Sequence, residues 1–201
     1  MSPLTLPAIR QALQAGAPPR LDVDLNASLA CVAMVLAGQE AEPLVCLIRR
    51  AERPHDPWSG QMALPGGRAE ADDASPQAVA EREAREEVGL PLAPRHLIAP
   101  LVVLPVRARG LETGMRLGAF VYQWEGAPPP LEPDPAEVAE VVWMPVPDLF
   151  DPALRTRFHF EREGTRYDMP ALEWQGRVIW GLTYRVLAEF GARLGRTLPV
   201  T

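Results

Sequence analysis

The sequence predicts an α/β fold in which a mixed β-sheet lies between helices. Short apolar runs bounded by turn residues occur in both halves of the chain, and segments with helical spacing of apolar residues precede, separate and follow them. Hydrophobic residues make up 47% of the 201 residues, which is enough for a full core. The length fits a single domain over residues 1–201.

The N-terminal quarter is predicted to form a helix and then a hairpin. Apolar residues spaced as on one helix face predict a short amphipathic helix over residues 4–15. Two apolar runs, residues 28–36 and 44–48, predict buried strands joined by a polar turn. Residues 49–67 are rich in Pro and Gly, and a loop of this length without a periodic element is often functional.

The clearest helix signals in the chain bound residues 75–88. Ser75 is a suitable N-cap, and Pro76 suits the first helical position. Gly89, followed by Pro91, ends the helix. Small and apolar residues recur on one narrow face, which is formed by Ala80, Ala84 and Val88.

The C-terminal half predicts further strands and a last helix. These segments are strands at residues 97–106, 115–124 and 138–144, a hairpin of residues 156–161 and 166–169, and a helix over residues 178–194. We expect one sheet to combine the strands of regions 28–48, 97–124 and 138–169.

The composition argues against nucleic-acid and membrane partners. The chain carries 20 basic and 26 acidic residues, a net charge of −6, so a broad basic surface for a phosphate backbone is not expected. The longest uncharged apolar run, residues 29–37, is far shorter than the ~20 residues of a membrane helix, and the N-terminus has no signal-peptide pattern. Cys31 and Cys46 lie in apolar stretches and are expected to be buried free thiols. These features predict a cytoplasmic protein.

The helix over residues 75–88 carries acidic residues on one face. Glu83 lies three and four residues before Glu86 and Glu87, so the three carboxylates repel one another. A surface helix with solvated salt bridges would account for such a cluster. However, the helix follows the Pro-Gly-Gly segment 65–67, which lets the backbone approach a ligand closely. Clustered carboxylate oxygens also suit Mg²⁺, which would relieve the repulsion and attract a phosphate.

This region resembles the Nudix box, GX5EX7REUXEEXGU. The matching region spans residues 67–90, and all five fixed letters of its second half are present from Arg82 to Gly89. Asp73 stands where the pattern has Glu, and eight residues rather than seven separate it from Arg82. This longer spacing is typical of the coenzyme A diphosphatase branch of the family.

The resemblance implies a fold, a chemistry and residue roles. The fold would be a Nudix-type α/β/α sandwich with a central mixed β-sheet. Nudix enzymes hydrolyse a nucleoside diphosphate linked to another moiety, with Mg²⁺ or Mn²⁺ as cofactor. By position, Glu83, Glu86 and Glu87 would be the metal-binding and catalytic carboxylates, and Arg82 would orient a glutamate through a salt bridge. A metal here would neutralise the diphosphate and lower the pKa of a bound water.

Segments outside the box resemble the coenzyme A diphosphatase branch. Residues 47–51 and 59–67 are similar to its upstream motif, LLTXR(S/A)X3RX3GX3FPGG, and residues 178–185 are similar to its C-terminal region. The resemblance implies coenzyme A or acyl-coenzyme A as substrate, with 3′-phospho-AMP and a 4′-phosphopantetheine as products. Two departures stand against it: the second arginine position falls on His55, and the spacing to the following glycine is one residue longer. Nucleoside triphosphates, nucleotide sugars and a non-catalytic nucleotide-binding module remain alternatives.

The remaining candidate residues flank the box. Substrate contacts are expected from Arg50, Trp58, Gly66 and Gly67. Trp58 would stack on an adenine ring or pack the loop onto the core. Glu137 or Glu140 would supply a further carboxylate, with an exposed strand-end Glu as the alternative. The expected partner is a small nucleotide-type molecule. Apolar termini and proline-rich loops would suit a homodimer, although the sequence leaves the oligomeric state open.

Overall fold

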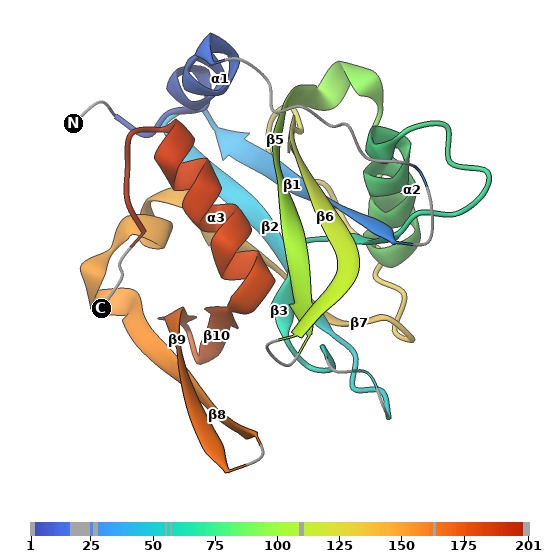
Figure 1. The fold of residues 1–201 in the computed structure, drawn as a ribbon. Helices are drawn as coiled ribbons and strands as arrows, with labels where there is room; N and C mark the ends of the chain where they lie inside the picture. Colours follow the sequence, from blue (N-terminus) through green and yellow to red (C-terminus); the bar gives the residue numbers. More distant parts are fainter. Residues whose placement is uncertain are drawn as a thin grey trace.

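Three helices cover the two faces of a central seven-stranded sheet, and a three-stranded sheet stands at one end of the molecule (Figure 1). The computed structural model describes residues 3–16, 25, 28–54, 56, 58–108, 111–162 and 164–198. The helices are α1 (Leu6–Ala15), α2 (Pro76–Val88) and α3 (Gly181–Arg193). The helices expected near residues 4–15 and 75–88 are therefore confirmed.

The central sheet is mixed, as expected. Its strands follow the order β3–β2–β1–β6–β5, with β4 beside β1 and β7 beside β2. Strand β1 runs parallel to β6, whereas its pairings with β2 and β4 are antiparallel. The strands are β1 (Leu29–Gln39), β2 (Glu42–Arg50), β3 (Met62–Ala63), β4 (Gly66–Arg68), β5 (Leu97–Ala108), β6 (Leu111–Gln123) and β7 (Val138–Pro145). The first hairpin and the strands expected between residues 97 and 144 are confirmed.

Alternate residues of β1 divide the core into two layers. Cys31, Ala33 and Val35 belong to the layer that contains the apolar face of α2, whereas Met34 and Leu36 belong to the layer of α1 and α3. Successive side chains of a strand point to opposite faces, so a strand covered on both faces is apolar throughout. The expected α/β/α sandwich is confirmed.

The strands after residue 154 form a separate sheet. Its members, in the order β10–β9–β8, are β8 (Arg155–Arg162), β9 (Thr165–Trp174) and β10 (Arg177–Trp180). The expectation that region 138–169 joins one sheet with the earlier strands was therefore wrong for β8 and β9. Two short 3₁₀ helices, Val146–Phe150 and Pro152–Leu154, each with a proline in the first turn, lead the chain out of the central sheet after β7.

The last helix starts later than the sequence predicts. Residues 178–180 were expected to be helical, but they form β10 and pair with residues 171–173 of β9. Gln175 and Gly176 have φ of 50° and 76°, and this tight turn returns the chain alongside β9. Helix α3 then begins at Gly181.

The two cysteines lie in neighbouring strands, Cys31 in β1 and Cys46 in β2. Cys31 and Cys46 are free and buried, as expected. Burial raises the pKa of each thiol to about 12. In the part of the chain that the structure describes, no helix is both long and apolar enough to cross a membrane.

Candidate functional site

Helix α2 carries its acidic residues beside its packed face, and one of them, Glu87, is itself buried. Ser75 accepts a hydrogen bond from the N–H of Ala78 (3.1 Å), and Gly89 ends the helix with a φ of 70°. The buried residues of the helix are Val79, Ala80, Ala84, Glu87 and Val88. The alanines let α2 lie close to the sheet, and this packing fixes the direction in which the carboxylates point.

We call Glu83, Glu86 and Glu87 the acidic cluster. Arg82 bonds two of its members, Glu83 and Glu86, together with Asp73. Its Nε and Nη2 donate to the two carboxylate oxygens of Asp73 (3.1 and 3.0 Å), and its Nη1 donates to Glu83 (3.0 Å) and Glu86 (2.9 Å). A second bond from Nη2 reaches the carbonyl oxygen of Arg68 (2.8 Å). These bonds match the five N–H donors of a guanidinium, so the side chain is fixed in position. The Arg82 guanidinium also holds the pKa of Asp73 below its ordinary value.

Two glycines of β4 bring the backbone against α2. A Cβ on Gly67 would lie 2.3 Å from Oε1 of Glu83, and a Cβ on Gly66 would lie 2.3 Å from the carbonyl oxygen of Cys31. The N–H of Gly66 donates to Glu87 (2.8 Å). Both positions therefore need glycine, because any side chain would displace either a glutamate or the backbone of β1.

Glu83 and Glu87 lie where their ionised forms are disfavoured. Glu87 is 2% exposed, and burial, with the charges of Glu83 and Glu137, raises its pKa to about 7. Burial also raises the pKa of Glu83, with a contribution from the charges of Glu86 and Glu137. The guanidinium groups of Arg82 and Arg50 therefore compensate the negative charge of Glu83 and Glu87 only in part.

Arg50, at the end of β2, reaches Glu87. Its Nη2 donates to Asp56 (3.1 Å), and its Nη1 lies 3.9 Å from Glu87. The Nε of Arg50 is buried and has no hydrogen-bond partner among the residues that the structure describes. A buried N–H without a partner is costly.

Of the two downstream candidates, Glu137 lies near the cluster. Its charge acts on the carboxyls of Glu83 and Glu87, and it forms an ion pair with Arg53 (3.2 Å). Glu140 instead pairs with Arg177 and an arginine of β2, away from the cluster. The structure thus brings Glu137, and not Glu140, to the candidate site.

The loop before β3 contains both an expected residue and a missed one. Trp58 is half-buried and packs against the core layer of α1 and α3. His55 lies outside the described residues. Sequence analysis missed Asp56, which accepts from Arg50 and from the N–H of Trp58 (2.9 Å). An aspartate that bonds a backbone N–H two residues ahead is typical of an Asx turn, and this pattern could have marked it.

The donor set fits a hard divalent cation. Carboxylate oxygens are the ligands that Mg²⁺ prefers, and a cation would favour the ionised forms that burial and like charge disfavour in Glu83 and Glu87. Within the described ranges, no group of three or more His, Cys, Asp or Glu side chains is arranged to hold an ion. The guanidinium of Arg82 bonds both Glu83 and Glu86. The fit therefore rests on the chemistry of the donors.

Comparison with known proteins places this site in a family. The model of the NUDIX domain matches residues 27–165. NudL of Photorhabdus laumondii subsp. laumondii, an uncharacterized Nudix hydrolase, is 29% identical over 187 residues, which cover 90% of this chain and 92% of NudL. The uncharacterized protein C14C4.10c of Schizosaccharomyces pombe is 31% identical over 162 residues, which cover 71% of this chain and 49% of that protein. The chain thus spans about half the length of that relative.

A solved structure shares the fold. The MutT/nudix family protein from Enterococcus faecalis superposes with a TM-score of 0.55 at 16% sequence identity, covering 95% of this chain and 70% of that protein. The segment matched by the family model contains α2, both glycines of β4 and the whole acidic cluster. The chain therefore belongs to the NUDIX domain family and is a Nudix hydrolase.

Proposed function

We propose that this hydrolase cleaves the diphosphate bond of coenzyme A or acyl-coenzyme A, giving 3′-phospho-AMP and the corresponding 4′-phosphopantetheine. The observation that carries the proposal is the position of Glu83, Glu87 and Arg50 around the backbone of Gly66 and Gly67. Clustered carboxylates beside an arginine suit a diphosphate bound through a divalent cation.

The acidic residues of α2 have distinct tasks in this proposal. Glu83, Glu86 and Glu87 would hold Mg²⁺ or Mn²⁺, which when bound supplies charge neutralisation and a more acidic water. Arg82 keeps Glu83 and Glu86 in place through its two bonds. Glu137 would add a further carboxylate. Phosphoryl transfer depends mainly on positioning and charge stabilisation, so a rigid set of carboxylates supplies what the reaction requires.

Arg50 would bind the substrate. Its terminal nitrogens face two carboxylates, whereas its buried Nε has no partner in the described chain. A guanidinium donates charge-assisted bonds to phosphate oxygens, so we propose that the terminal nitrogens of Arg50 bind the substrate. Gly67 lets the carboxylate of Glu83 lie against the backbone of β4. We propose Gly66, Gly67 and Trp58 as further substrate contacts.

The choice of coenzyme A rests on sequence outside the box. Residues 47–51, 59–67 and 178–185 are similar to segments of the coenzyme A diphosphatase branch. Nucleoside triphosphates and nucleotide sugars are the alternative substrates. One contact favours that alternative: Arg53, the arginine nearest the branch's second arginine position, is already paired with Glu137.

Product analysis by mass after incubation with coenzyme A and Mg²⁺ or Mn²⁺ tests the proposal. We expect the wild type to release 3′-phospho-AMP and the Glu86→Gln variant to release far less. Glu81→Gln is the matched control, since Glu81 lies on the same helix and bonds Gln77 rather than Arg82. Its activity should equal that of the wild type.

The outcomes separate the substrate from the chemistry. Cleavage of another diphosphate but not of coenzyme A would overturn the coenzyme A assignment alone. Metal-independent binding of nucleotides with no turnover of any diphosphate would overturn the catalytic proposal and favour a binding module. We also propose a cytoplasmic location, because the free, buried Cys31 and Cys46 suit a reducing compartment.

A further inference from the structure

The β8–β9 hairpin is an arm with two unlike faces, and it projects from the body of the molecule (Figure 1). Along β8, Arg157, His159 and Glu161 are exposed, whereas Phe158 and Phe160 between them are half-buried. This period of two marks a sheet with one polar and one apolar face. The polar face suits water, and the apolar face is only partly covered.

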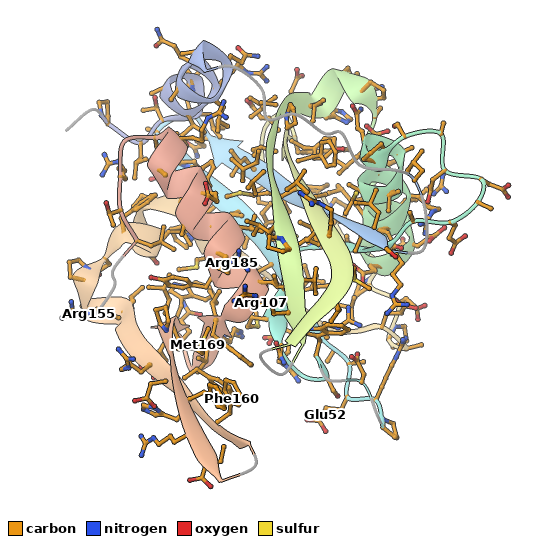
Figure 2. The ribbon with its side chains drawn as sticks, viewed as in Figure 1. Glu52, Arg107, Arg155, Phe160, Met169 and Arg185 are labelled. Atoms are coloured by element: carbon orange, nitrogen blue, oxygen red, sulfur yellow. The ribbon has the colours of Figure 1, made fainter. Side chains whose placement is uncertain are left out.

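Aromatic side chains form a continuous strip on the apolar face. Phe158 stacks on Trp180 of β10, with ring centroids 3.9 Å apart, and Phe160 stacks on Tyr167 of β9 at 4.9 Å. Met169 lies opposite Phe158 in the register, and Figure 2 labels Met169 and Phe160 on the arm. Tyr167 is 36% exposed, one of the most exposed large apolar side chains in the described structure. We call Phe158, Phe160, Tyr167 and Trp180 the aromatic strip.

A cavity of about 540 Å³ opens at the base of this strip. It lies between residues 59–62, before and in β3, and the turn between β9 and β10. Phe158 and Trp180 line it, so the cavity and the aromatic strip are continuous. Beyond the cavity, the apolar surface continues along the β8–β9 hairpin from Phe158 to Phe160. These two residues are two positions apart in the strand, a distance of roughly 7 Å.

The polar end of the cavity carries an excess of positive charge. Its charged lining residues are Arg49, Arg177 and Glu140. Glu140 accepts from Arg177 and from Nε of Arg49 (3.4 Å), and the Arg177 guanidinium holds the pKa of Glu140 below its ordinary value. One carboxylate thus faces two guanidinium groups, which leaves a net charge of about +1 at the polar end.

This cavity lies on the opposite face of the central sheet from the acidic cluster. In β2, Ile48 belongs to the core layer of α2, and Leu47 belongs to the layer of α1 and α3. Arg50 continues the side of Ile48 and reaches Glu87, whereas Arg49 continues the side of Leu47. The sheet therefore separates the cavity from the carboxylates of α2.

We propose that the cavity and the aromatic strip bind a small anionic amphiphile, a carboxylate or phosphate head group on an apolar tail, at a site separate from the acidic cluster. The head group is held by the charge excess of Arg49 and Arg177, and the tail lies along Phe158 and Phe160. Charge-assisted bonds from guanidinium groups select an anion, and contact with the half-buried rings removes apolar surface from water.

Calorimetric titration of the full chain with octanoate tests this site. We expect one octanoate per chain with a Kd on the order of 0.1–1 mM, as ten non-hydrogen atoms allow. Acetate, which lacks the tail, and 1-octanol, which lacks the charge, should each bind at least about tenfold more weakly. The Glu83→Gln variant should bind octanoate as the wild type does, whatever its effect on hydrolysis, so failure of the proposed function leaves this test intact.

Variants locate the two ends of the ligand. Phe160→Ser should weaken octanoate binding about fivefold or more, and Glu161→Ser, the next residue on the opposite face of the same strand, should not change it. Arg177→Gln, which leaves Glu140 paired with Arg49, should weaken it about tenfold. Unchanged affinity in both Phe160→Ser and Arg177→Gln, or no octanoate binding by the wild type, would overturn the proposal. Displacement of octanoate by coenzyme A would overturn its separation from the substrate site.

Discussion

Substituting Gly67 with alanine should separate activity from stability. The added Cβ would lie 2.3 Å from Oε1 and 2.5 Å from Cδ of Glu83. Ordinary non-bonded contact begins near 3.4 Å, so the carboxylate must move by about 1 Å. Because this group lies at the end of a flexible side chain, it can swing away without moving the backbone.

The expected losses of stability and activity follow from the displacement of the Glu83 carboxylate. Glu83 would lose its 3.0 Å bond to Arg82, which keeps its other acceptors, so the fold should lose at most about 1 kcal/mol. A displacement of about 1 Å in a positioning group can reduce turnover about 100-fold, or about 2.7 kcal/mol of transition-state stabilisation. The assay measures kcat/KM on a diphosphate that the wild type cleaves, together with thermal denaturation of the same preparation.

The neighbouring glycine provides a matched control. In Gly66→Ala the new Cβ would lie 2.3 Å from the carbonyl oxygen of Cys31 and 2.6 Å from Cα of Val32, and neither backbone atom can turn aside. This variant should lose about 2 kcal/mol of stability or more. If Gly67→Ala retained full activity, the position of Glu83 would not matter to the reaction. If it instead lost as much stability as Gly66→Ala, the assumed freedom of the Glu83 side chain would be refuted.

Three further predictions concern packing, acid stability and thiol reactivity. Ala84→Leu overpacks a fully buried position of α2 and should lower the free energy of unfolding in urea by about 1–3 kcal/mol, and an unchanged midpoint would contradict the close packing of α2 on the sheet. Arg82 lowers the pKa of Asp73 below 3.8, so their pairing stabilises the fold above that pH and is lost as the pH falls through the lowered pKa. Asp73→Asn should therefore flatten the pH dependence of unfolding in acid, and an unaltered profile would refute the pairing. Cys31 and Cys46, with pKa values of about 12, should resist iodoacetamide at pH 8 in the native state and react on unfolding, as mass spectrometry would record.

Local sequence signals predict most elements because those elements follow from local physics. Strand β1 is buried on both faces and so contains no charge to interrupt its apolar run, and α2 has a cap, a first-turn proline and a terminal glycine within its own segment. The separate sheet of β8–β10 was not predicted, since strand pairing depends on where the chain goes between strands. The start of α3 was misplaced because residues 178–180 pair with β9, and that long-range hydrogen bonding overrides their helical spacing.

In the candidate site, too, the sequence predicts the part that lies within one element and not the contacts between distant segments. The spacing of Glu83, Glu86 and Glu87 on one helix predicts a shared face, and this part of the site lies within a single element. The contacts of Arg50 come from residues far apart or from an irregular loop, and a sequence pattern does not say which acceptor an arginine reaches. The ion pair of Arg53 with Glu137 joins residues more than eighty positions apart and could not be anticipated from spacing.

The two departures of this box from the Nudix pattern, in residue type at position 73 and in spacing to Arg82, are related. Asp73 has one methylene fewer than the glutamate in the pattern, and one additional residue separates it from Arg82. In the structure both oxygens of Asp73 accept hydrogen bonds from Arg82, and its own carboxylate also accepts from the N–H of Glu70 (2.8 Å). The shorter side chain thus reaches the guanidinium with the loop before α2 at its present length. A glutamate restored at position 73 without shortening the loop would have an excess methylene to accommodate, so the departure in length and the departure in residue type belong together.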